Sequence, residues 1–181
     1  MTQKSVKIES RSVRRPERTG EALAKLLKPG DTVLLDGNLG AGKTAFVRGL
    51  CRGLGIGSGV TSPTFALMNV YEGVFPDGTP CETVHCDAYR LGSREDLYDI
   101  GFYDFDENSV RIVEWAGNVF ASSGKGPDSI GDAEREKILE ESGENCFYVY
   151  IKRRDDIAAN RREITVMTGG TRGDRLADII H

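Results

Sequence analysis

Several features that would mark a membrane, secreted or zinc-binding protein are missing from this sequence. No apolar run approaches the ~18 residues that a membrane-spanning helix requires, and the first residues lack the apolar core of a signal peptide. The four cysteines form no C-x-x-C pair and show no metal-ligand spacing with the two histidines. We therefore expect a soluble, cytoplasmic protein whose cysteines are reduced and mostly buried.

The chain also lacks the positive net charge that is typical of a dedicated nucleic-acid-binding protein. Its formal net charge is −4 at pH 7. Arginine and lysine do cluster at 11–18, 152–154 and 161–162, and we interpret these clusters as solvated surface charge. With 181 residues, of which 39% are hydrophobic, the chain can form one domain around a single core.

The most informative motif is the stretch from Gly37 to Thr44, which fits G-x-x-x-x-G-K-[ST], the phosphate-binding loop of nucleoside triphosphatases. It follows an apolar, β-branched run at 32–36 and opens into a helix-like segment at 45–51. In this context the glycines let backbone N–H groups wrap phosphates, and the helix N-terminus adds partial positive charge. Lys43 would reach the β and γ phosphates, and Thr44 would ligate Mg²⁺. The sequence therefore predicts a nucleotide-binding protein.

Strand-like and helix-like segments alternate along the chain, with adjacent strand pairs in two places. This pattern favours an α/β fold with three layers, of the P-loop NTPase type, around a mixed, mostly parallel β-sheet. A polar segment at about 121–144 is expected to be a mobile insertion, with one exposed helix, in a single domain over 1–181. We expect strands at 5–12, 32–36, 66–71, 82–86, 110–115, 146–152 and 163–167, and helices at 16–27, 45–51, 93–99 and 172–180.

Two acidic residues stand where a triphosphate–Mg²⁺ site needs carboxylates. Asp87 follows the strand that ends Val84-His85-Cys86, as a Walker-B acid would, and Glu114 ends the strand at 110–114. Mg²⁺ prefers oxygen ligands, and a carboxylate at the end of an apolar strand is costly to bury without a partner. The alternative for each is a strand-end residue that turns into solvent.

Three further features of the sequence are less specific to one function. The hydroxyl side chains of Thr61, Ser62 and Thr64 surround a proline, and they could form a switch loop that senses the γ phosphate; an ordinary turn is the alternative. His85 is expected to pack within its strand and not to act as a catalytic base. Trp115 is expected in the core or at an interface.

Four ordered motifs together resemble the TsaE (YjeE) family, the small ATPases of bacterial threonylcarbamoyladenosine synthesis on tRNA. They are the loop at 39–44, Ser62-Pro63-Thr64-Phe65, His85-Cys86-Asp87-Ala88-Tyr89-Arg90-Leu91 and Glu114-Trp115. The resemblance covers residues 19–115 well and resumes weakly at Arg162. The polar segment after Trp115 departs from the family, which is usually compact there.

This resemblance implies a P-loop fold, ATP as the nucleotide, slow hydrolysis and work with the TsaB–TsaD pair. A weak or indirect contact with tRNA is a further expectation. By matching position, Leu39, Gly40, Ala41, Gly42, Lys43 and Thr44 would hold the phosphates, with Thr44 and Glu114 on Mg²⁺, Asp87 as the Walker-B acid and Arg162 on the base or sugar side.

Two other functions use the same loop. A small-molecule kinase would pass the γ phosphate to a hydroxyl group, but kinases of this size usually carry an arginine-rich lid and an acceptor pocket. A GTPase switch would need an Asn-Lys-x-Asp signature, which does not occur in the sequence. ATP hydrolysis is therefore the favoured expectation, and the kinase is the alternative.

Overall fold

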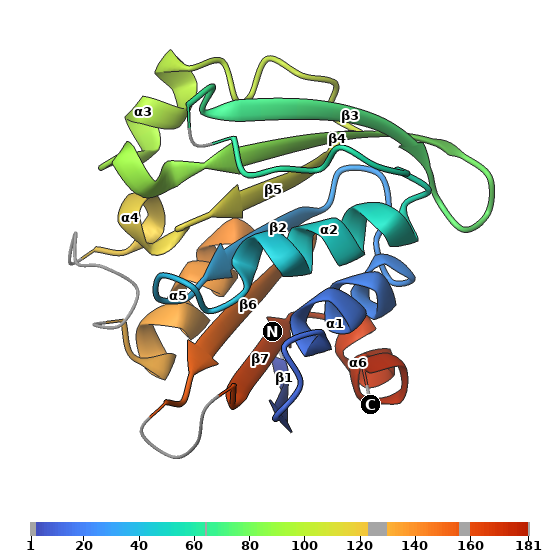
Figure 1. Ribbon diagram of the computed structural model, residues 1–181. Helices are drawn as coiled ribbons and strands as arrows, with labels where there is room; N and C mark the ends of the chain where they lie inside the picture. Colours follow the sequence, from blue (N-terminus) through green and yellow to red (C-terminus); the bar gives the residue numbers. More distant parts are fainter. Residues whose placement is uncertain (1–2, 64, 123–129, 156–159, 181) are drawn as a thin grey trace.

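The computed structural model describes residues 3–63, 65–122, 130–155 and 160–180 (Figure 1). The strands are β1 (Lys4–Ser10), β2 (Thr32–Asp36), β3 (Met68–Val74), β4 (Pro80–Asp87), β5 (Val110–Glu114), β6 (Cys146–Arg153) and β7 (Arg162–Thr168). The helices are α1 (Arg15–Ala24), α2 (Lys43–Gly53), the short 3₁₀ helix η1 (Ala88–Arg90), α3 (Arg94–Asp99), α4 (Gly117–Phe120), α5 (Asp132–Ser142) and α6 (Arg172–Ile180). Each strand and helix expected from the sequence is present, with ends shifted by a few residues at most.

The strands form one mixed sheet in the order β1-β7-β6-β2-β5-β4-β3. The four central strands β6, β2, β5 and β4 pair in parallel, and antiparallel partners flank them on both sides. Parallel strands end at the same edge of a sheet, and ligands of open α/β sheets bind outside that edge. The loop after β2 and the acids that end β4 and β5 are therefore brought together at one edge.

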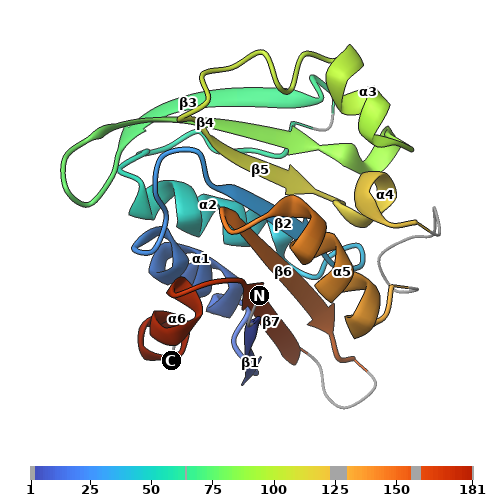
Figure 2. The ribbon, with the colours of Figure 1, turned by 180° about the vertical axis from the view of Figure 1, so that it is seen from behind.

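Helices cover both faces of the sheet, which gives the three layers expected (Figures 1 and 2). One apolar core joins the sheet to α1, α2 and α6, with Leu23, Phe46 and Leu176 among its members. The second core joins the opposite face to α3, α4 and α5, through residues such as Leu97 and Ile138. Alternate side chains of β2 enter the two cores, since successive residues of a strand point to opposite faces.

Helices α1 and α2 lie in close contact because glycines stand where they meet. A Cβ atom at Gly49 would lie 1.8 Å from the carbonyl oxygen of Glu17, and one at Gly20 would lie 2.1 Å from that of Phe46. No larger residue fits at either position without moving a helix. The contact holds the first turn of α2, and with it the phosphate-loop motif, against α1.

The polar segment expected at 121–144 includes a helix, α5. Its described part is not wholly exposed, because Arg135, Ile138 and Leu139 are buried against the sheet. Residues 123–129 lie outside the described part of the chain, and mobility of the segment stays a prediction. In the described ranges, none of the helices has the length and apolar character needed to cross a membrane.

Candidate nucleotide-binding site

The loop between β2 and α2 has the backbone geometry that its glycines predict. Gly37, Gly40 and Gly42 all have positive φ angles, of 146°, 75° and 115°. A Cβ atom at Gly37 would also lie 2.2 Å from the carbonyl oxygen of Ile151 on β6. Only glycine combines these angles with such close packing. Helix α2 starts at Lys43, so its first N–H groups open onto the loop, as anion binding at a helix N-terminus requires.

Lys43 is enclosed by the loop and by Trp115. Its side chain is buried, with the residue 5% exposed, and Nζ donates to the carbonyl oxygens of Gly37 at 2.5 Å and Asn38 at 3.1 Å. Nζ also lies 3.6 Å from the centroid of the Trp115 ring, a cation–π contact. Trp115 has φ = 59°, which is rare for a bulky residue and turns the chain directly after Glu114. Trp115 is half-buried and packs against the second core, as expected, and it also lines the cleft.

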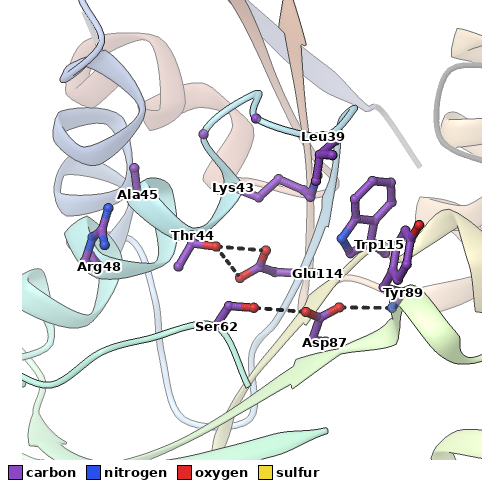
Figure 3. A pocket seen from close by; sticks show the side chains of 12 residues that line it. Leu39, Lys43, Thr44, Ala45, Arg48, Ser62, Asp87, Tyr89, Glu114 and Trp115 are labelled. Atoms are coloured by element: carbon purple, nitrogen blue, oxygen red, sulfur yellow. Dashed lines mark hydrogen bonds between the residues drawn. The ribbon is translucent and has the colours of Figure 1, made fainter. Parts of the chain in front are cut away.

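The two predicted acids stand side by side, since Asp87 on β4 is the register partner of Glu114 on β5. Both Glu114 oxygens lie 3.4 Å from the Thr44 hydroxyl, which can donate to either (Figure 3). Asp87 accepts hydrogen bonds from the Ser62 hydroxyl at 2.9 Å and from the Tyr89 backbone N–H at 3.0 Å. Neither acid turns into solvent, because both are buried. The structure thus brings the loop threonine and both carboxylates together.

These groups border a cleft of about 480 Å³. Its floor and one wall come from the phosphate loop and α2, and the facing wall comes from the ends of β4 and β5 (Figure 3). The lining residues are Leu39, Gly40, Gly42, Lys43, Thr44, Ala45, Arg48, Ser62, Asp87, Tyr89, Glu114 and Trp115.

The donor set fits a magnesium ion that is shared with a nucleotide. Among the described residues, no group of three or more His, Cys, Asp or Glu side chains could hold a metal ion by itself. Mg²⁺ in nucleotide sites is typically held by one or two carboxylates together with substrate phosphates and water. Thr44, Glu114 and Asp87 match that pattern.

His85, which the sequence assigned to strand packing, is buried on β4 and also touches the site. Its Nε2 lies 2.8 Å from Glu114 Oε1. The sequence shows only that His85 shares a face of its strand with Asp87, two residues later, because alternate residues of a strand point the same way. The same motif contains Tyr89, whose ring packs edge-on against Trp115 with centroids 4.9 Å apart.

Arg162 lies behind the loop and does not line the cleft. It is 8% exposed, and its Nε donates to the carbonyl oxygen of Ala41 at 3.1 Å. Its observed contact is therefore with the phosphate loop itself. Direct contact of Arg162 with the base or sugar of a nucleotide stays a prediction.

The outcome differs for each of the three residues of the predicted switch loop. Ser62 lines the cleft and bonds Asp87. Thr61 is exposed, and its carbonyl oxygen accepts hydrogen bonds from the side chains of Asn69 and Tyr71. Thr64 lies outside the described residues.

Burial raises the pKa of two groups next to the site. Cys86 precedes Asp87 but belongs to the opposite core, and burial raises the pKa of its thiol to about 12. A thiol of this kind stays protonated and cannot serve as a nucleophile near neutral pH. Burial also raises the pKa of Asp36, the last residue before the loop, although Tyr148 and the Gly117 N–H donate hydrogen bonds to it.

Comparison with known proteins agrees with this geometry. Residues 10–138 match the family model described as threonylcarbamoyl adenosine biosynthesis protein TsaE. The tRNA threonylcarbamoyladenosine biosynthesis protein TsaE of Bacillus subtilis is 35% identical over 169 residues, which are 90% of this chain and 87% of the relative. The protein of the same name from Treponema pallidum is 43% identical over 111 residues, 61% of this chain and 78% of the relative.

A solved structure has the same fold. The crystal structure of YdiB from Bacillus subtilis superposes with a TM-score of 0.62 at 28% identity, and the match covers 99% of this chain and 96% of YdiB. The family match spans the phosphate loop, Asp87 and Glu114, which are the residues that form the cleft. The chain therefore belongs to the TsaE family.

Proposed function

We propose that this protein binds ATP with Mg²⁺, hydrolyses it slowly and serves threonylcarbamoyladenosine modification of tRNA. The observation that carries this proposal is the convergence of Thr44, Glu114 and Asp87 at the mouth of a phosphate loop. The relatives' names connect the family to this tRNA modification. Such a role places the protein in the cytoplasm.

The cleft would act by holding charge in place and not by covalent chemistry. The backbone N–H groups of the loop would receive the α and β phosphates, and Lys43 would exchange its bonds to the carbonyl oxygens of Gly37 and Asn38 for the β and γ phosphates. Thr44 and Glu114 would hold the magnesium ion, which neutralises charge that develops on the phosphates. Asp87, which accepts a hydrogen bond from Ser62, would orient the attacking water.

The residues that line the cleft support the proposal of low turnover. Among the described lining residues Arg48 is the only arginine, and it stands on α2 one turn beyond Thr44. P-loop enzymes that lack a well-placed arginine can gain roughly 10³–10⁵ in rate when a partner completes the site. We therefore propose that the TsaB–TsaD pair raises a slow basal rate.

Exposed apolar side chains supply a surface for that partner. Leu39 and Tyr89, which line the cleft, are 84% and 58% exposed, and Phe65, three residues after Ser62, is 96% exposed. Large apolar side chains that gather in the open are typical of a protein interface. The Ser62–Phe65 loop would be ordered by the γ phosphate, so docking should depend on the nucleotide.

The arginine clusters support at most a weak or indirect contact with tRNA. Arg161 pairs with Glu9, Arg154 with Glu163 and Arg153 with Asp155. Charges already paired on the surface contribute less to phosphate binding. A gel-shift titration with tRNA, with and without the TsaB–TsaD pair, tests for direct contact.

The function is tested by titrating purified TsaB–TsaD with this protein loaded with a non-hydrolysable ATP analogue or with ADP, and by following phosphate release. We expect tighter association with the ATP analogue, a higher hydrolysis rate in the complex and loss of both in a Phe65→Ser variant. Equal affinity in the two nucleotide states with an unchanged rate would contradict the partner role. Transfer of phosphate to added hydroxyl compounds in place of water would favour the kinase alternative.

A further inference from the structure

His85 lies beneath the cleft, inside the sheet. Its side chain is 0% exposed, and it does not line the cleft. It stands on the same face of β4 as Asp87, whose register partner on β5 is Glu114. His85 thus reaches Glu114 from within the sheet, whereas Thr44 reaches it from α2.

The contact between His85 and Glu114 is a hydrogen bond between the imidazole ring and the carboxylate. A carboxylate only accepts hydrogen bonds, so Nε2, at 2.8 Å from Oε1, carries the proton. Nδ1 is buried and has no hydrogen-bond partner among the described residues. The ring therefore donates from Nε2 toward Glu114.

The hydrogen bond from His85 fixes the direction of the Glu114 carboxylate. The 2.8 Å bond from His85 is shorter than the 3.4 Å contacts from Thr44. It holds one carboxylate oxygen in a defined direction.

We propose that His85 is a positioning residue, which donates from Nε2 to Glu114 and orients this carboxylate toward Thr44 and a shared Mg²⁺ ion. The proposal rests on the function proposed above and adds a residue that acts through Glu114. Partners that orient a metal ligand typically change metal affinity by about 10–100-fold when they are removed. His85 should therefore matter for the metal and little for the nucleotide itself.

The matched pair His85→Gln and His85→Met separates hydrogen bonding from packing. Glutamine and methionine have similar length, but only glutamine can donate near the position of Nε2. The readout is a Mg²⁺ titration of the ATP-bound protein, followed by the fluorescence of Trp115, which lines the cleft and is the single tryptophan of the chain. We expect His85→Met to raise the Mg²⁺ midpoint about tenfold or more. His85→Gln should restore it, and ATP affinity without Mg²⁺ should stay near the wild-type value in both variants.

Val84→Ala is the control, because Val84 is buried on the same strand but faces the other core. It should lower stability and leave the Mg²⁺ midpoint unchanged. Should His85→Met fold poorly, His85→Leu replaces it, since leucine likewise cannot donate a hydrogen bond to Glu114. Equal losses in the Gln and Met variants, or no loss in either, would overturn the role of His85. If Mg²⁺ caused no response in the ATP-bound wild-type protein, that result would instead contradict the proposed function.

Discussion

Glu114 is the residue on which the charge balance of the cleft depends most. It receives hydrogen bonds from two elements, the Thr44 hydroxyl on α2 and the His85 ring on β4. The carboxylate itself is buried. A buried charge of this kind is expensive unless something of opposite sign shares the site, and the ammonium group of Lys43 and a magnesium ion would both do so.

Glu114→Gln should therefore abolish Mg²⁺-dependent hydrolysis and keep the fold. The amide has the shape of the carboxylate but brings no negative charge to the metal. Because a metal supplies several kcal/mol of transition-state stabilisation, kcat should fall by roughly 10²-fold or more. Phosphate release measured against the Mg²⁺ concentration tests this, and ATP affinity without Mg²⁺ serves as the control. Hydrolysis at the wild-type rate would leave Asp87 as the leading metal-side acid.

The sequence could identify single site residues whose chemistry appears in a motif. The phosphate loop, Asp87 and Glu114 are recognisable because residue type and position next to a strand suffice. The pairing of His85 with Glu114 cannot be recognised in the sequence, since it depends on the register between β4 and β5. Nor could a sequence pattern predict that Trp115 takes a positive φ angle and lies over Lys43.

At the scale of elements, the contact between α1 and α2 holds the phosphate loop in place. Gly42 of the loop packs against Pro16 at the start of α1, and Gly49 of α2 meets the backbone of Glu17. Two helix backbones this close leave no room for a side chain between them. The loop is thus anchored on both sides, by β2 before it and by the α1–α2 pair after it.

Gly49→Ala should destabilise the protein strongly, because its Cβ atom would lie 1.8 Å from a backbone oxygen that cannot move alone. Overpacking of this kind typically costs about 1–3 kcal/mol or more in the free energy of unfolding. Gly57→Ala is the matched control, since a Cβ atom there meets nothing within 4 Å, and it should change stability by less than about 0.5 kcal/mol. Urea denaturation of the two variants makes the comparison. Equal stabilities would mean that the two helices separate easily.

Local periodicity and capping residues predicted the elements well. The capping box of Ser93 and Asp96 opens α3 as expected, and β2 and α6 have the predicted bounds. The sequence did not give the order of the strands, because pairing in a parallel sheet joins segments far apart in the chain. It also did not reveal that α5 buries a face, since charged residues such as Arg135 hide the pattern: its guanidinium group lies over the Tyr150 ring, at 3.7 Å from the centroid.

At the scale of the whole molecule, buried thiols link stability to alkaline pH. All four cysteines are free and buried, and burial raises the pKa of Cys51 and Cys146 from 9.0 to about 12. Above pH 9 the unfolded chain loses these protons while the folded chain keeps them. The free energy of unfolding must therefore fall as the pH rises from 9 toward 12.

Cys146→Ala should reduce this slope by about 1.4 kcal/mol per pH unit, because one thiol no longer contributes to the linkage. Denaturation curves at several pH values between 9 and 11 give the free energy of unfolding against pH for the wild type and the variant. The loss of packing lowers this free energy equally at every pH, so it does not affect the slope. An identical slope in the variant would show that the Cys146 thiol ionises as easily in the folded protein as in the unfolded one.

The central claim is that Lys43 and the loop around it hold the phosphates of ATP. Calorimetric titration of ATP with Mg²⁺ into the wild-type protein and a Lys43→Ala variant tests it most directly, with circular dichroism to establish that the variant is folded. Charge-assisted hydrogen bonds are worth roughly 1.5–3 kcal/mol each, so we predict one bound ATP per wild-type chain and at least about tenfold weaker binding by the variant. Unchanged ATP affinity in the folded variant would contradict the assignment of the phosphate loop.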